Sequence, residues 1–256
     1  MLQGMVSDGG ACLKPLRFAS RWSVTVAAAF ALTAPSLALA QSARRGEIPV
    51  VVELFTAQGC TSCPQANAML GRLAEDDGTV ALTFSVDYWD YLGWKDTFAE
   101  PAFTARQRAY VSRMKLKEIY TPEVVVGGRT ETPAVDEDEV EALVEAEAKA
   151  RRRGPPMRFR YAGHFVTVED GAVPRGGAEV WLVRYDPMAR EVKVRTGDNA
   201  GKTIEHFNVV RQLERLGPWR GRTRTYTIPA AARPHLKTVV IVQGADGGPI
   251  LGALSD

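Results

Sequence analysis

From residue 48 onward, the chain shows hydrophobic patterns typical of alternating strands and helices. Residues 48–56, IPVVVELFT, form a continuous apolar run rich in β-branched residues, which predicts a strand buried on both faces. Pro64 suits the first turn of a helix, whose apolar stripe reaches the turn at residues 76–78. The segment from Thr79 to Val86 predicts a second strand.

The same alternation continues to about residue 153. Apolar residues at helical spacing predict a helix between residues 103 and 114, and residues 123–126 predict a third, short strand. Asp136 and Glu139 resemble a capping box that opens a helix ending near Arg153. Strands that alternate with helices predict parallel pairing, so we expect a layered α/β domain over residues 47–153.

A change of pattern at Gly154-Pro155-Pro156 marks the expected domain boundary. Beyond it, alternating runs separated by turns predict a mostly β, sandwich-like domain over residues 157–256. Residues 204–216 fit a strand or a helix, and we favour a strand. The other expected strands are Met157–Val168, Ala178–Tyr185, Glu191–Thr196, Thr223–Ile228 and Lys237–Val242.

Residues 1–40 have the pattern of a secretory signal peptide. Three basic residues precede an apolar run that ends in Ala38-Leu39-Ala40, a small-x-small cleavage pattern followed by Gln41. The strongly apolar part is shorter than the ~20 residues that a membrane span needs, which disfavours a retained anchor. We therefore expect cleavage near Ala40-Gln41 and a periplasmic or secreted protein without a stable membrane anchor.

The charges of the mature chain balance. The whole chain has 32 Lys and Arg against 30 Asp and Glu, and removal of three bases and Asp8 with the leader leaves 29 of each. This balance predicts no nucleic-acid-binding surface. About 216 residues remain, enough for one large or two small domains, and they predict no particular oligomeric state.

Two cysteines remain in the mature chain, Cys60 and Cys63, directly after the first strand. A bond between them would close a very short loop and add little stability, so redox chemistry or metal binding is the better interpretation. A helix N-terminus stabilises a thiolate through its unpaired N–H groups and its dipole. We expect Cys60 to be the more exposed nucleophile with the lower pKa, and Cys63 to attack the mixed disulfide.

This Cys-x-x-Cys motif after a buried strand resembles the thioredoxin-like superfamily over roughly residues 47–153. The segment YTPEVVV, residues 120–126, has the form of the Thr-Pro that precedes a short strand in those proteins. The resemblance implies a Cys60–Cys63 disulfide, a cis bond before Pro122, and a Thr121 backbone that faces the disulfide and offers an edge to substrate peptides.

A closer resemblance covers nearly the whole mature chain. The segments that carry it are ELFTAQGCTSCP, VDYWDYLGWKD, FTARQRAY, YTPEVVVGGR and GDNAGKTIEHFNVVR. They are similar to the DUF1223 family, exported thioredoxin-like proteins of unassigned function.

Other side chains are weaker candidates for the site. Glu53, in the first strand, resembles the acid that moves protons for the inner cysteine of many thioredoxins, or it is a partly exposed carboxylate at a strand end. Tyr88, Trp89 and Trp94 follow the second strand, at the sheet edge where sites form, and either line a substrate site or pack as local core. The three histidines, at residues 164, 206 and 235, are scattered and fit structural roles.

The leading hypothesis is a thiol–disulfide oxidoreductase that acts on protein or small-molecule thiols and needs no cofactor. A copper(I) or zinc carrier is an alternative because thiolates bind soft metals, although neither methionine nor histidine stands near the motif. A non-catalytic binding module, with the β-rich half as its working surface, is the other alternative.

Overall fold

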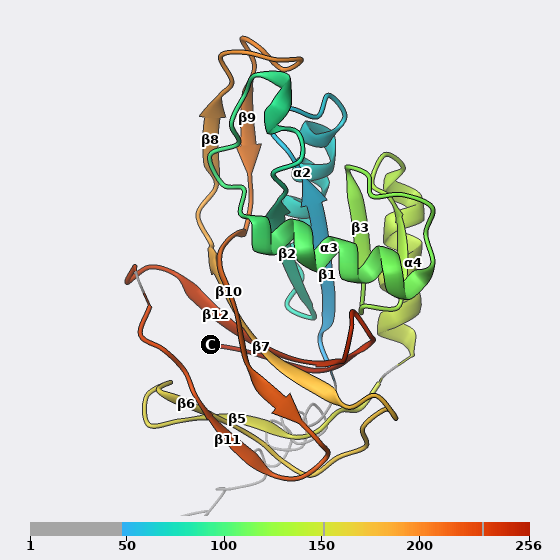
Figure 1. The fold of residues 1–256 in the computed structure, drawn as a ribbon, viewed down its shortest axis with the longest axis vertical. Helices are drawn as coiled ribbons and strands as arrows, with labels where there is room; N and C mark the ends of the chain where they lie inside the picture. Colours follow the sequence, from blue (N-terminus) through green and yellow to red (C-terminus); the bar gives the residue numbers. More distant parts are fainter. Residues whose placement is uncertain (1–47, 151, 232) are drawn as a thin grey trace, which may run out of the picture. The chain divides into compact units, whose positions relative to one another are not determined.

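An eight-stranded mixed sheet with the strand order β13-β12-β7-β10-β2-β1-β3-β4 forms the centre of the protein (Figure 1). It is seen in a computed structural model that describes residues 48–150, 152–231 and 233–256, which belong to one compact unit. The expected signal peptide lies outside the described residues. Within them, no helix is long and apolar enough to cross a membrane.

The N-terminal part has the expected strands and helices. β1 is buried along its whole length and pairs in parallel with β2, in a register that joins Val50 to Thr79 and Thr56 to Ser85. The elements are β1 (Val50–Thr56), α2 (Cys63–Leu73), β2 (Thr79–Ser85), the 3₁₀ turn η1 (Asp90–Leu92), α3 (Pro101–Met114), β3 (Glu123–Val126), β4 (Thr130–Pro133) and α4 (Glu137–Lys149).

The expectation of parallel pairing throughout was wrong for β3, which runs antiparallel to β1. α3 lies across the strands rather than along them (Figure 1), so the chain re-enters the sheet at the edge where β1 ends. Glu123, the first residue of β3, accordingly lies opposite Phe55, near the end of β1. A short antiparallel strand, β4, follows, which the sequence pattern did not indicate.

Helices cover both faces of this part of the sheet. Alternate residues of β1, such as Val52 and Leu54, pack against α2 and α4, while Val51 and Phe55 point into a second core with α3 residues. The expected capping box is confirmed at its N-cap, because the Asp136 carboxylate accepts a hydrogen bond from the Glu139 amide at 3.3 Å. Burial on two faces explains the continuous apolar run in β1.

The C-terminal part is β-rich, as expected, and residues 204–216 lie in strands except at the bend of residues 207–208. The segment 157–168 is a hairpin rather than one strand, and β13 was missed because Gly252 interrupts its apolar pattern. The strands are β5 (Met157–Arg160), β6 (Phe165–Val168), β7 (Ala178–Asp186), β8 (Arg190–Lys193), β9 (Thr203–His206), β10 (Val209–Trp219), β11 (Arg224–Thr227), β12 (Lys237–Gly244) and β13 (Ile250–Ser255).

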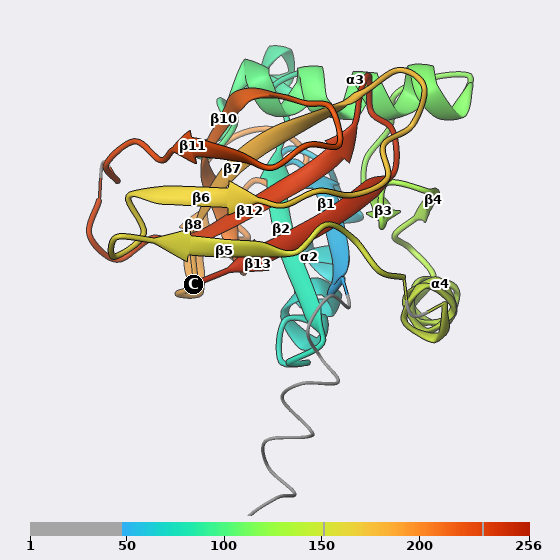
Figure 2. The same cartoon turned by 90° about the horizontal axis from the view of Figure 1, so that it is seen from below.

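These strands form three sheets. β7, β10, β12 and β13 extend the central sheet, and β8 and β9 pair only with each other. The three-stranded sheet β11-β6-β5 lies over β7, β12 and β13 (Figure 2), and its residues Val166 and Tyr226 share a core with Val180 and Val240.

The segments on either side of residues 154–156 share a sheet and a core. Val209 of β10 pairs in parallel with Thr83 of β2. The core cluster that contains Phe55 also contains Val183 and Ile241. Both segments contribute to the same layers of the structure. The division into domains 47–153 and 157–256 therefore stays a prediction from the sequence.

Candidate functional site

Cys60 and Cys63 form a disulfide at the junction of β1 and α2, with their Cα atoms 5.4 Å apart. Cys63 is the first residue of α2, and Cys60 lies in the turn before it. The Cys60 amide donates to the Ala57 carbonyl at 3.2 Å, and the Cys63 amide donates to the Cys60 carbonyl at 3.3 Å. This tight turn holds the sulfur pair at the N-terminus of the helix.

Both cysteines are buried in the oxidised protein. Cys60 is 1% exposed and Cys63 is 0% exposed, so in this state almost nothing separates them and the expected greater exposure of Cys60 stays a prediction. A side chain from another part of the fold covers the turn, and the aromatic residues after β2 pack beside it.

Asn199 fastens the β8–β9 hairpin, residues 190–206, onto the cysteine turn. Its fully buried side chain amide donates to the carbonyls of Gln58 at 2.9 Å and of Cys60 at 2.8 Å. The Lys202 ammonium donates in turn to the side-chain oxygen of Asn199 at 2.9 Å. Figure 1 shows the hairpin standing beside α2, at the end of the sheet where β1 and β2 finish.

A second contact joins the base of this hairpin to α2, one turn after Cys63. The Asn67 amide bonds to the Glu205 carbonyl and to Nδ1 of His206, each at 3.1 Å, and its oxygen accepts from the Thr56 hydroxyl at 2.8 Å. Burial lowers the pKa of His206 to about 4, so its ring is neutral at physiological pH. His206 therefore has a structural role here, consistent with the sequence interpretation.

The aromatic loop after β2 lies next to the cysteine turn. Tyr88 and Trp89 pack against the core cluster that contains both cysteines. The Trp94 indole N–H donates to the Gln58 side-chain oxygen at 2.8 Å. The loop thus reaches the turn both through packing and through Gln58.

The carboxylate of Asp96 binds the backbone of the same turn. The backbone N–H of Gln58 donates to the Asp96 carboxylate at 2.7 Å. Burial raises the pKa of Asp96 to about 6, although backbone hydrogen bonds oppose the shift. Sequence reasoning missed Asp96 and Asn199, although both lie in or beside the segments that carry the family resemblance.

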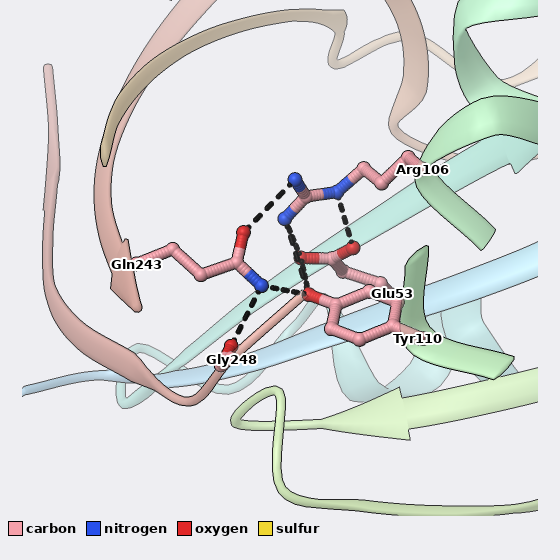
Figure 3. Close-up of polar contacts among 5 residues, drawn as sticks. All are labelled: Glu53, Arg106, Tyr110, Gln243 and Gly248. Atoms are coloured by element: carbon pink, nitrogen blue, oxygen red, sulfur yellow. Dashed lines mark hydrogen bonds and ion pairs between the residues drawn. The ribbon is translucent and has the colours of Figure 1, made fainter. Parts of the chain in front are cut away.

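Glu53 is engaged elsewhere in the core. Its carboxylate accepts from Arg106 at 2.7 and 2.6 Å and from the Tyr110 hydroxyl at 3.1 Å, and Gln243 completes the network (Figure 3). Burial disfavours the charged guanidinium, but Glu53 beside it holds the pKa of Arg106 above its ordinary value. The alternative of a partly exposed carboxylate was wrong, because Glu53 is fully buried.

The Thr121-Pro122 bond is cis, as the resemblance implies. Pro122 accepts a hydrogen bond from the Ala134 amide at 3.0 Å, and β3 begins at the next residue. The cis peptide bond therefore lies at the end of the sheet where β1 finishes. The described residues record no hydrogen bond from Thr121 to a cysteine, so its substrate-binding role stays a prediction.

The described ranges offer little for a metal ion. These contain no group of three or more His, Cys, Asp or Glu residues arranged to hold a metal ion. The only two cysteines in these ranges are joined to each other.

Two solved structures are similar to this chain. Protein AGR_C_4864 from Agrobacterium tumefaciens is 28% identical, with a TM-score of 0.66, over 82% of this chain and 94% of that one. HBP35 of Porphyromonas gingivalis is 13% identical, with a TM-score of 0.56, over 82% of this chain and 75% of that one, a likeness of fold alone. No curated protein matched.

A family model described as a protein of unknown function, DUF1223, matches residues 51–243. This range includes the cysteine turn, the aromatic loop, Asn199 and the core network around Glu53 and Arg106. The chain belongs to the DUF1223 family.

Proposed function

We propose that this protein is an exported thiol–disulfide oxidoreductase in which residues 47–153 act as a thioredoxin-like domain. The observation that carries the proposal is the disulfide between Cys60 and Cys63 at the N-terminus of α2. A bond across two residues adds little stability, whereas a helix N-terminus favours the thiolate that exchange chemistry requires.

The first turn of α2 strengthens this argument. It contains no acidic residue, so no carboxylate there offsets the positive end of the helix dipole. The Ser62 hydroxyl lies 3.6 Å from Sγ of Cys60 and can donate to a thiolate formed there. Cys60 is therefore the nucleophile, and Cys63, at the helix start, is the resolving thiol.

Burial of Cys60 adds a condition to the mechanism. A substrate thiolate must approach Sγ of Cys60, which is 1% exposed while the hairpin is fastened by Asn199. The hairpin or the aromatic loop therefore moves before exchange. In this way the hairpin, the aromatic loop or both control access of protein or small-molecule thiols to the disulfide.

The signal-peptide pattern supports a reaction outside the cytoplasm, where disulfides persist. The mature protein would work in the periplasm or after secretion, without a bound cofactor. Whether it donates or accepts electrons depends on its reduction potential, which covers about 150 mV among Cys-x-x-Cys proteins.

Redox titration of the purified mature protein against glutathione tests this function. We expect a reversible two-electron equilibrium that Cys60→Ser and Cys63→Ser abolish. In Cys63→Ser, thiolate absorbance should titrate well below the usual pKa of about 8.5. An unshifted thiol, or a pair that retains copper(I) or zinc and does not exchange, would refute the proposal, and the second result would favour a metal carrier.

A further inference from the structure

Glu123 is a fully buried carboxyl at the sheet edge that carries the disulfide. It lies opposite Phe55 in the register of β3 with β1. The Cys60 amide bonds to Ala57, two residues beyond Phe55, and Phe55 and both cysteines share one core cluster. Glu123 and the redox turn therefore lie at the same end of the sheet, where β1 finishes and β3 begins.

One oxygen of this carboxyl and three oxygen atoms of residues near it are buried and have no hydrogen-bond partner among the described residues. They are the Tyr88 hydroxyl, Oε1 of Gln107, the Thr121 hydroxyl and Oε1 of Glu123. Gln107 donates to the other Glu123 oxygen at 2.5 Å, and the Tyr88 hydroxyl lies close to Gln107 and Thr121 without ordinary hydrogen-bond geometry. Because buried polar groups are nearly always paired, such a concentration indicates function rather than packing.

The charged groups that face Glu123 do not favour its ionised form. Glu53 from β1 and Glu131 from β4 are carboxylates, and the Arg106 cation is already bonded to Glu53. Tyr88 and Tyr120 contribute phenols, and Tyr120 is hydrogen-bonded to Glu131. Burial, followed by the field of Glu131 and Glu53, raises the pKa of Glu123 to about 7, although the bond from Gln107 opposes this shift.

We propose that Glu123 is the proton store of the Cys60–Cys63 pair, acting through the Tyr88 and Thr121 hydroxyls. The inference rests on the proposed function and names the group that supplies and accepts its protons. Among the described residues no hydrogen bond joins Glu123 to either sulfur, so it acts through other groups and is not itself a catalytic residue. Glu53 is less suited because its carboxylate is held by Arg106.

The exchange with a substrate dithiol balances as follows. One substrate thiol loses its proton to solvent, its thiolate attacks Sγ of Cys60, and Cys63 leaves as a thiolate that takes the Glu123 proton. The second substrate thiol gives its proton to the Glu123 carboxylate and attacks the substrate sulfur of the mixed disulfide. Cys60 leaves as a thiolate and takes a proton from solvent. The substrate is oxidised to a disulfide, and the cysteine pair is reduced with two protons.

The test measures the rate constant for exchange with dithiothreitol between pH 5 and pH 9, divided by the thiolate fraction of the reagent. The wild-type profile should show an inflection near pH 7 that Glu123→Gln removes, and the rate constant should fall at least about tenfold, less than a positioned acid or base often contributes. Glu131→Gln, on the adjacent strand, is the matched control and should retain the inflection, moved to lower pH because the field of Glu131 on Glu123 is removed.

Two results would overturn the inference. One is a Glu123→Gln profile that matches the wild type, since a merely structural role would leave the pH dependence unchanged. The other comes from the wild-type protein alone: if carboxyl NMR shows the same Glu123 titration in the oxidised and reduced forms, the carboxyl does not serve the pair. A wild-type protein that exchanges no faster than a Cys-x-x-Cys peptide would instead refute the proposed function.

Discussion

The Asn199 side chain donates a hydrogen bond to the backbone carbonyl of Cys60 at 2.8 Å, across 139 residues of sequence. A buried amide that pairs with the carbonyl of the proposed nucleophile fixes both the turn and the hairpin beside it. The contact is therefore placed to couple access to the disulfide with the position of the β8–β9 hairpin.

Replacing Asn199 with Ala should expose the disulfide more often. The change leaves buried carbonyls unpaired, at a cost of about 1–3 kcal/mol. A loss of about 1.4 kcal/mol in the opening free energy would raise the open population about tenfold. Stopped-flow reduction by dithiothreitol should accelerate accordingly. Asn208→Ala is the matched control, because its amide bonds to the Ala81 carbonyl, away from the cysteines; equal acceleration there would contradict the idea.

Stability should depend on pH through Glu123. Its folded-state pKa of about 7 lies above its value in the unfolded chain, so its contribution is fully present below that unfolded value and is lost as pH rises through 7. Gln resembles the protonated carboxyl. Urea unfolding should therefore give Glu123→Gln a stability similar to wild type near pH 4 and a higher one at pH 8. A constant difference across this range would show that burial does not perturb this carboxyl.

Local patterns predicted the elements that build the site. The apolar run of β1, the proline in the first turn of α2 and the Asp136 cap each depend on neighbours within a few residues, so each could be recognised from the sequence. The position of the disulfide at a strand–helix junction followed from these signals.

Contacts between distant segments were not predictable in the same way. Arg106 pairs with Glu53 across 53 residues, and Asn199 reaches Cys60 from the second half of the chain. Such pairs create no periodicity, so the burial of Cys60 and the engagement of Glu53 could not be anticipated. The antiparallel direction of β3 likewise depends on α3 crossing the sheet.

The aromatic loop should report the redox state. Trp89 packs against the cluster that contains the disulfide, and a disulfide quenches indole fluorescence on contact. Reduction should brighten the emission, and Trp89→Phe should remove most of the change, with a smaller loss in Trp94→Phe. Trp219→Phe is the control, because Trp219 lies in the separate core under β11. If the emission does not change with the redox state, the loop has only a structural role.

Glu53 should matter for stability rather than for exchange. In Glu53→Gln, Arg106 remains buried without its carboxylate, which typically costs about 3–5 kcal/mol. Urea unfolding should show this loss, while the pH profile of exchange in the folded protein should keep its inflection, moved to somewhat lower pH because the charge of Glu53 contributes to the raised pKa of Glu123. Arg72→Ala, which breaks an exposed ion pair with Glu137, is the control and should change stability little. Complete loss of the inflection in Glu53→Gln would assign the proton store to Glu53 instead.

A fragment that ends near Arg153 should not fold on its own. It would lose Val209, which pairs with Thr83, and Gln243, which bonds to both Arg106 and Tyr110.

The same truncation would leave the core around Phe55 without its partners from β7, β10, β12 and β13. Each Å² of apolar surface left exposed removes roughly 25 cal/mol of folding free energy. The Arg106–Glu53 pair would also be exposed to water on the side that Gln243 covers in the whole protein. Circular dichroism of the fragment should therefore show little cooperative unfolding, and its cysteines should react like those of an unstructured peptide. A cooperative transition with retained exchange would show instead that residues 47–153 form an independent folding unit, and that the shared sheet is a docking surface between two domains.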